Sequence, residues 1–136
     1  MPECVAMCST ANRIPVKRTR VTGVHETRDV SSLPWNPHAK FPGVAMQHLV
    51  TGSETGGRMS IHHVRVGPGC AIGDHTHAGI VEIHDVLEGS GICTVDGKEI
   101  PYVPGVIGIM PVDTVHRIVA GDQGILLLAT FSPPLV

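Results

Sequence analysis

Short apolar segments alternate with turn signals from residue 44 onward, and this alternation constrains the fold more than any other feature of the chain. Turns recur about every 8–12 residues, a spacing that is typical of an all-β sandwich or barrel. Apolar residues do not recur at helical spacing over three turns in this region, so we expect no long helix. The predicted strands cover residues 44–50, 58–66, 79–87, 92–95, 100–103, 106–111, 116–120 and 125–131.

The N-terminal third differs from this pattern. Residues 1–20 are polar and irregular, and the segment SSLPWNPHAKFPG at 31–43 contains three prolines and one glycine, which favours a loop on the surface of a domain. Trp35 is expected to anchor that loop through its ring. A length of 136 residues suits one domain. We therefore predict an N-terminal arm and loop over 1–43 and a single β-barrel domain over 44–136.

Composition excludes several classes of function. The formal net charge is −2 without a block of like charges, so no nucleic-acid partner is expected. No apolar run approaches the roughly 18 residues of a membrane span. The first residues lack the basic and apolar regions of a secretory signal, so we expect a cytoplasmic protein whose four cysteines are thiols. Cys4 and Cys8 have no second pair at zinc-finger spacing.

The segment GDHTHAGIVEIHDVLEG at 73–89 carries the most unusual residues. In a strand, side chains at i and i+2 share a face, so His75 and His77 are expected to project in parallel. Glu82 and His84 share the next face with apolar neighbours, which predicts a buried carboxylate. Such a carboxylate is costly unless it is paired or bound to a metal. Two imidazoles and Glu82 could share a cation, and His116 could add a fourth ligand.

These residues resemble the first conserved motif of the cupin superfamily. Gly69, His75, His77, Glu82 and Gly89 match every defining position at the required spacing. Residues 105–120 are similar to the second cupin motif, and they provide the fourth candidate ligand. Here two positions depart from the pattern, because Asp113 stands in place of glycine and Ala120 in place of asparagine. Asp113 falls in a turn, where aspartate is tolerated.

The resemblance implies an all-β cupin fold, a double-stranded β-helix or jelly-roll barrel, with a metal ion in its mouth. It implies that His75, His77, Glu82 and His116 hold one divalent transition metal per chain. Fe, Mn, Ni and Zn all suit these ligands, so the ion stays open. Candidate inward residues of the barrel are Val64, Val66, Ile80, Val86, Ile107, Ile109, Ile118 and Leu126.

Two further histidines require separate interpretation. His84 departs from the family, which commonly has an aromatic or aliphatic residue at this position. It is either a core histidine that is hydrogen-bonded to a neighbour or a group that acts beside the metal. His62 is expected to point inward with Val64 and Val66, as a packed histidine or as a second candidate acid or base.

The function inferred from these features is that of a small metal-dependent cupin acting on a small organic molecule. Dioxygenase, lyase and isomerase chemistry remain open, with Glu82 and His84 as the candidate catalytic residues. The alternative is a non-catalytic module that binds a metal and a metabolite, so the question of enzyme activity stays open here. Aromatic residues form only 3% of the chain, which favours a small, mostly apolar cavity. We also expect a homodimer that packs through the outward residues Val81, Ile83 and Leu87.

Overall fold

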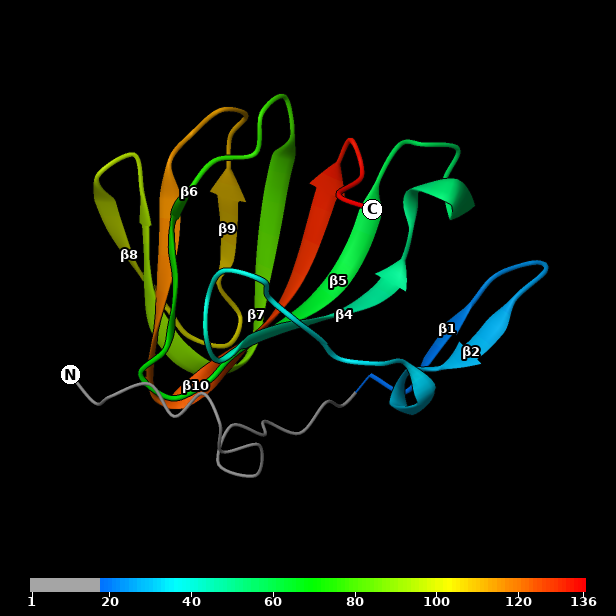
Figure 1. The fold of residues 1–136 in the computed structure, drawn as a ribbon, viewed down its shortest axis with the longest axis horizontal. Coiled ribbons are helices and arrows are strands. Elements are labelled where there is room, and N and C mark those ends of the chain that lie inside the picture. Colours follow the sequence, from blue (N-terminus) through cyan, green and yellow to red (C-terminus); the bar gives the residue numbers. More distant parts are fainter. Residues whose placement is uncertain (1–17) are drawn as a thin grey trace.

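The structure is a computed structural model that describes residues 18–136, and it confirms the predicted all-β architecture (Figure 1). Strands make up almost all of its regular structure, and the two helices are single turns. The strands are β1 (Arg20–Thr22), β2 (Thr27–Asp29), β3 (Asn36–Pro37), β4 (Val44–Val50), β5 (Ser60–Val66), β6 (Ala71–His75), β7 (Val81–Val95), β8 (Lys98–Tyr102), β9 (Ile107–Met110) and β10 (His116–Ser132). The 3-10 helices are η1 (Val30–Ser32) and η2 (Gly52–Glu54).

The two long strands β7 and β10 organise the barrel. They pair with each other antiparallel, and β10 also pairs with β5 through its second half and with β6 through its first half. In the same way, β7 pairs with β9 through its first half and with β8 through its second half. Each long strand therefore belongs to both walls of the barrel. Figure 1 shows the wall with β6 and β8 facing the wall with β4 and β5.

The turns predicted at 88–91 and between 120 and 125 are wrong, because the chain continues through both as strand. The register between β7 and β10 shifts between Ala120 and Ile125, so the strands bend there together. Gly89 has a φ of 77°, and a Cβ on it would lie 2.1 Å from the carbonyl oxygen of Gly124. Glycine is thus required by the close approach of two backbones within a bend, rather than by a turn that ends a strand.

The inward face of the barrel agrees only partly with the predicted set. Val64, Val66 and Val86 are buried in the core as expected. Ile107 and Ile109, however, are 64% and 62% exposed, so the inward prediction is wrong for both. Along β9 the even-numbered residues Gly108 and Met110 are buried, whereas the odd-numbered residues were predicted to face inward. A Cβ on Gly108 would lie 1.8 Å from the hydroxyl oxygen of Tyr102, so this glycine makes room for a buried tyrosine.

Leu126 also differs from the prediction. It is buried, but it lines a surface cavity with Arg18, Leu87 and Glu88 instead of the interior of the barrel. Its neighbour Leu127 has the inward orientation and lines the barrel cavity. Residues 125–128 are all apolar and do not alternate with polar residues. The sequence therefore does not show which of them point into the barrel.

Residues 18–43 contain short structured elements. β3 pairs with β4, and β1 and β2 form a separate hairpin whose Arg28 forms an ion pair with Glu54 of η2. The Trp35 ring lies under the Arg65 guanidinium at 4.1 Å, which anchors the loop to β5 as expected. The domain boundary at residue 43 stays a prediction, and Cys4 and Cys8 lie outside the described residues.

Cysteine chemistry differs from the expectation at one position. Cys70 is buried and disulfide-bonded, so the prediction of a thiol is wrong for this residue, whereas Cys93 is a buried free thiol. The prediction was based on the lack of a recognisable export signal. Whether two cysteines can form a disulfide depends on their distance and geometry in the folded chain, which that argument does not address. Within residues 18–136 no helix is long and apolar enough to cross a membrane.

Candidate metal centre

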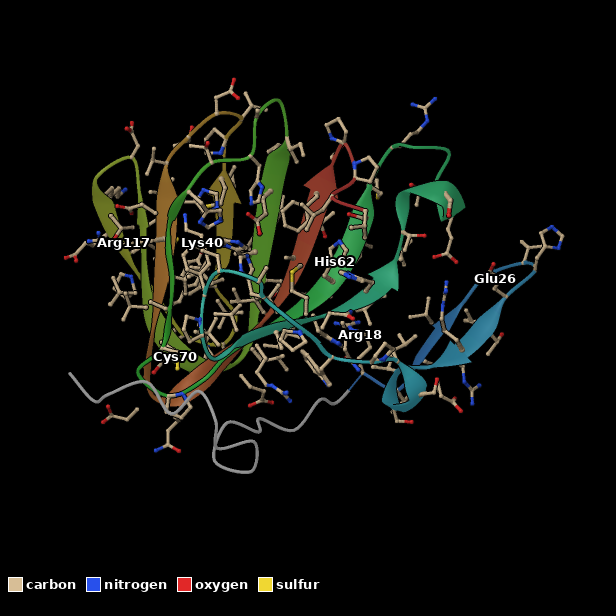
Figure 2. All side chains as sticks on the ribbon, in the orientation of Figure 1. Arg18, Glu26, Lys40, His62, Cys70 and Arg117 are labelled. Atoms are coloured by element: carbon tan, nitrogen blue, oxygen red, sulfur yellow. The ribbon has the colours of Figure 1, made fainter. Side chains whose placement is uncertain are left out.

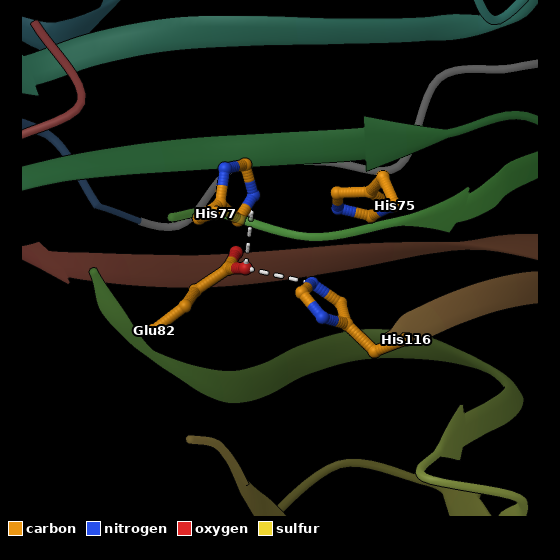
Figure 3. Close-up of side chains that lie close together, drawn as sticks. All are labelled: His75, His77, Glu82 and His116. Atoms are coloured by element: carbon orange, nitrogen blue, oxygen red, sulfur yellow. Dashed lines mark hydrogen bonds and ion pairs between the residues drawn. The ribbon is translucent and has the colours of Figure 1, made fainter. Parts of the chain in front are cut away.

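Four side chains from three strands and one turn converge in the mouth of the barrel (Figure 3). His75 ends β6, His77 lies in the turn that follows, Glu82 lies near the start of β7, and His116 begins β10. His116 is the register partner of His75 in the β6–β10 pair. One potential ligand atom from each residue lies within 4.8 Å of the others. We call these four residues the His/Glu cluster.

The prediction that His75 and His77 lie on one strand is wrong in detail, because β6 ends at His75. The two rings are nevertheless neighbours, with centroids 4.9 Å apart and nearly perpendicular planes. The turn at 78–79 brings the chain back toward Glu82, and the Gly79 N–H donates to the Asp113 carboxylate at 2.9 Å. The turn after His77 is therefore tied to the turn that precedes His116.

Backbone carbonyls orient two of the imidazoles. Nδ1 of His75 donates to the Gly73 carbonyl at 2.7 Å, and Nδ1 of His116 donates to the Thr114 carbonyl at 3.0 Å. Because a carbonyl only accepts, each Nδ1 carries a hydrogen, which leaves Nε2 as the nitrogen that can bind a metal ion. Fixing a histidine ligand in this manner is a common feature of protein metal sites. The two rings are thus held in the orientation that a metal ligand requires.

Glu82 is 5% exposed and is ionised despite its burial. Burial alone would raise the pKa of Glu82, but hydrogen bonds from His116 and His84 hold it well below its usual range. Oε1 lies 3.1 Å from Nε2 of His116 and 3.6 Å from Nε2 of His77. Oε2 lies 2.8 Å from Nε2 of His84. One carboxylate oxygen therefore faces the cluster, and the other faces His84.

The charge state of the histidines also suits a metal ion. Burial is the main cause that lowers the pKa of both His75 and His77. Their rings are neutral at neutral pH, and a neutral imidazole is the form that binds metals. Three imidazole nitrogens and one carboxylate oxygen form a donor set that suits first-row transition ions. The residues present thus fit the divalent metal that the sequence predicts.

His84 extends the polar network behind Glu82. It is 2% exposed, and its Nδ1 lies 2.9 Å from the hydroxyl of Tyr102, which is fully buried. Burial alone would lower the pKa of His84, but hydrogen bonds with Cys93 and Glu82 raise it to about 9. His84 is therefore a hydrogen-bonded core residue, the first of the two alternatives that the sequence left open, and its action in a reaction stays a prediction.

Three residues of the cluster, His75, His77 and Glu82, line a small cavity of about 120 Å³. A cavity of this volume suits a small ligand. None of the described residues that line it is a lysine or an arginine. The apolar part of the wall consists of Val44, Met46, Val64, Ile72, Leu127, Phe131 and Leu135. The expectation of a small, mostly apolar cavity is therefore correct.

His62 points inward from β5, as predicted, but does not line this cavity (Figure 2). Its Nε2 bonds to the Ser60 hydroxyl at 2.8 Å, and its Nδ1 to Nδ1 of His48 at 2.9 Å. The Phe131 ring separates His62 from His77, with centroids 5.4 and 5.2 Å from the two imidazoles. His62 is thus a packed histidine whose partners are other than the cluster.

Among the lining residues that sequence reasoning missed, two lie outside the predicted strands and the motifs. His38 comes from the loop before β4, and Leu135 comes from the C-terminal segment after β10. Neither lies in a motif or in a periodic segment. The proline-rich composition around His38 predicted a loop but not its course over the barrel, and this course is what brings His38 to the cavity.

The departures from the second motif both fit the structure. Asp113 has a φ of 58°, in the left-handed region where glycine and aspartate are tolerated. Its carboxylate also accepts the hydrogen bond from Gly79, which a glycine could not do. Ala120 is buried, and its N–H donates to the Cys70 carbonyl at 2.9 Å.

Comparison with known proteins agrees with this geometry. The chain is 31% identical over 122 residues to the dimethylsulfoniopropionate lyase DddW of Ruegeria pomeroyi, covering 79% of this chain and 78% of that protein. A structure described as a predicted oxalate decarboxylase from Thermotoga maritima superposes with a TM-score of 0.68 and 23% identity, over 76% of this chain and 95% of the other.

A sugar phosphate isomerase of the cupin superfamily from Silicibacter pomeroyi superposes with a TM-score of 0.65 and 25% identity, over 76% of this chain and 73% of the other. The family model described as "Cupin domain" matches residues 62–131, which span β5 to β10 and include the whole His/Glu cluster. With half of its length matched by this model, the chain belongs to the cupin family.

Proposed function

We propose that this chain is a metal-dependent lyase that releases dimethyl sulfide from dimethylsulfoniopropionate. One observation carries the proposal: three residues of the His/Glu cluster line a small, mostly apolar cavity that is also lined by His84, which is hydrogen-bonded to the Glu82 carboxylate. The relative from Ruegeria pomeroyi bears the name of such a lyase, and the chain aligns with most of its length. This relative supplies the first substrate to test.

In this proposal the cluster holds one divalent transition ion, through Nε2 of the three histidines and Oε1 of Glu82. When bound, the ion supplies Lewis-acid polarisation of the substrate carboxylate. Iron, manganese, nickel and zinc all remain compatible with these donors. The protein contributes the orientation, because the hydrogen bonds of His75 and His116 to backbone carbonyls hold both rings in place.

The cavity wall suits the other end of this substrate. Dimethylsulfoniopropionate has a carboxylate at one end and a dimethylsulfonium cation at the other. The apolar wall can receive the two methyl groups, and the Phe131 ring can attract the sulfonium charge. Lysine or arginine would repel that charge, and neither occurs among the described lining residues. A larger substrate, such as a sugar nucleotide, exceeds the cavity volume.

The proposed reaction is an elimination. Oε2 of Glu82 accepts the proton from the carbon next to the carboxylate, and that C–H electron pair forms the new carbon–carbon double bond. The carbon–sulfur bond breaks, and its electrons leave with sulfur as neutral dimethyl sulfide. The products are acrylate, dimethyl sulfide and one proton. His84 donates its Nε2–H to Oε2 and so fixes the position of the accepting oxygen.

The test is to measure metal content and product release on the same preparation. Protein purified without chelator is analysed by elemental mass spectrometry and incubated with dimethylsulfoniopropionate, and dimethyl sulfide is measured by gas chromatography. We expect about one ion per chain and release of dimethyl sulfide and acrylate in equal amounts. The double variant His75→Ala/His77→Ala should lose both the ion and the activity.

Metal-loaded protein that releases neither product would contradict the proposed lyase. If such protein still bound acrylate, the non-catalytic binding module would become the better interpretation. Oxygen consumption in the presence of iron would instead support dioxygenase chemistry. The homodimer and the cytoplasmic location also remain predictions. For the dimer, light scattering gives a direct test, and Ile109 extends the outward surface beside its register partner Ile83.

A further inference from the structure

The loop between β3 and β4 brings a histidine outside the motifs to the same cavity. His38 lines this cavity together with the His/Glu cluster, although much of its surface is exposed. Its backbone N–H donates to the Val44 carbonyl at 2.8 Å, so the loop closes back onto the start of β4. Figure 2 labels Lys40, which belongs to the same loop.

The hydrogen bonds of His38 determine where its proton lies. Nδ1 accepts from the backbone N–H of Lys40 at 3.0 Å and from that of Phe41 at 3.2 Å. A backbone N–H can only donate, so Nδ1 carries no hydrogen. The neutral ring must then have its hydrogen on Nε2, the nitrogen on the opposite side from the loop backbone. The loop thus builds a fixed N–H donor.

Phe41 fixes this loop against the strand that carries a candidate metal ligand. Its ring centroid lies 4.8 Å from that of His38 and 6.1 Å from that of His75. A Cβ on Gly73 would lie 3.0 Å from Cε1 of Phe41, so the ring is seated closely on β6. The position of His38 is therefore set by packing as well as by hydrogen bonds, which reduces the entropy cost of binding a ligand.

His38 stands apart from the other polar groups of the cavity. Among the described lining residues, the remaining polar side chains are His75, His77 and Glu82 of the cluster and their neighbour His84. Both nitrogens of His84 are already bonded, to Glu82 and to Tyr102. A small carboxylate held at the cluster through one oxygen has a second oxygen that needs a donor. Of the described polar side chains that line the cavity, His38 is the one outside the cluster and its partner His84, and its Nε2 has a hydrogen to donate.

We infer that His38 is a substrate-binding residue whose Nε2–H donates to a carboxylate oxygen of the ligand. This inference rests on the proposed function, because it takes the ligand to be the short carboxylate of that reaction. His38 takes no part in the proton transfer. It contributes to affinity and selects ligands that place a hydrogen-bond acceptor at the mouth of the cavity.

Two substitutions separate the two nitrogens of this side chain. In His38→Asn, the amide oxygen can replace Nδ1 as the acceptor for the loop N–H groups, but the donor at the Nε2 position is lost. In His38→Gln, the longer side chain can place an amide N–H near the Nε2 position. We expect His38→Asn to raise KM for dimethylsulfoniopropionate about tenfold or more, as for a hydrogen bond to a charged group. Its kcat, metal content and thermal midpoint should stay near those of the wild type.

Binding of acrylate to the metal-loaded protein, followed by calorimetry, tests the inference independently of turnover. We expect His38→Asn to weaken binding about tenfold and His38→Gln to recover part of the loss. This result would support the role of His38 even if the wild type released no dimethyl sulfide. Equal acrylate affinity in wild type and His38→Asn would overturn the inference. So would a wild type that holds the metal but binds no acrylate, or a His38→Asn variant that loses metal or melts early.

Discussion

At the scale of single residues, His84 is the feature that distinguishes this chain from the family pattern. Its two nitrogens connect the carboxylate of the cluster to the buried hydroxyl of Tyr102. The hydroxyl has room because residue 108 is glycine. These three positions therefore form one unit, in which Glu82 is held by a chain of buried hydrogen bonds. Such a network is costly to break, because each member left without a partner remains buried.

We predict that His84→Phe keeps the metal but lowers turnover. Phenylalanine fills the same space without a donor, so Oε2 of Glu82 loses its fixed orientation while Oε1 still faces the three histidines. The expected loss in kcat is about 10- to 100-fold. Elemental analysis and the initial rate of dimethyl sulfide release, measured on the same sample, check this expectation.

A matched control is His63→Phe on β5. His63 is equally buried and bonds to Gln47 at 3.0 Å, but it stacks on Trp35 and does not line the cavity. This variant should leave kcat near that of the wild type. If His84→Phe turned over as fast as the control, a role for His84 in the reaction would be excluded.

The sequence predicts the four residues of the cluster because their types and spacings are fixed by the chemistry of metal binding. His84 is also noticeable, as a charged residue type among apolar neighbours in a buried strand. His38 carries no such signal. Its position depends on the packing of Phe41 against Gly73, a contact between segments more than thirty residues apart in sequence. Contacts of this kind follow from the folded course of a loop, which local pattern does not encode.

At the scale of elements, the turn between β9 and β10 determines where His116 enters the barrel. Asp113 occupies a left-handed conformation in this turn and accepts the hydrogen bond from Gly79 in the turn after His77. Two loops that each deliver a ligand of the cluster are thereby held together. The substitution of aspartate for the family's glycine thus adds a contact as well as tolerating the backbone angle.

We expect Asp113→Ala to weaken metal binding and to lower stability by about 2–3 kcal/mol. The estimate combines the cost of alanine in the left-handed region, about 1–2 kcal/mol, with the loss of a hydrogen bond of about 1 kcal/mol. Asp113→Asn should stay close to the wild type, because asparagine tolerates this conformation and keeps an acceptor. Urea unfolding and metal titration are the measurements. Equal behaviour of the two variants would mean that the turn does not depend on this side chain.

The alternation of apolar segments and turns predicts well where strands occur. It does not predict whether two neighbouring segments form one continuous strand. Gly89 and Gly124 read as turn residues in sequence, yet they mark the bend that β7 and β10 share. Glycine signals both a turn and a close approach of two backbones. Only the pairing partner distinguishes these cases, and that partner lies more than thirty residues away along the chain.

At the scale of the whole molecule, the loop before β4 and the C-terminal segment after β10 both reach the cavity. The C-terminal segment returns over β5, where the Leu135 N–H donates to the Ser60 hydroxyl at 2.8 Å and the Val136 carbonyl accepts from Gly52 at 2.7 Å. Leu135 thus forms part of the cavity wall. The β5–β10 barrel supplies the cluster and part of the apolar wall, and segments outside it add His38, Val44, Met46 and Leu135.

Buried neutral histidines make the stability of the whole fold depend on pH. His62 and His63 have adjacent positions on opposite faces of β5, and both are fully buried. Burial, assisted by the nearby charge of His48 or Arg18, lowers the pKa of each from 6.5 to about 4. In the unfolded chain both rings take up a proton near pH 6.5, whereas in the folded chain they resist protonation until about pH 4. The unfolded state therefore binds more protons in this window.

We predict that the free energy of unfolding falls as the pH falls from 6.5 to 4. At 1.36 kcal/mol for each pH unit and each histidine, the two together account for about 2–4 kcal/mol between pH 7 and pH 5. His84, with its raised pKa of about 9, has the opposite sign and acts on the alkaline side. Urea unfolding at pH 7.0, 6.0 and 5.0 (about one unit apart) measures the slope. In His63→Phe, the dependence of the unfolding free energy on pH should be about half as steep, because only His62 still contributes. An unchanged dependence would mean that groups other than His63 cause the loss of stability in acid.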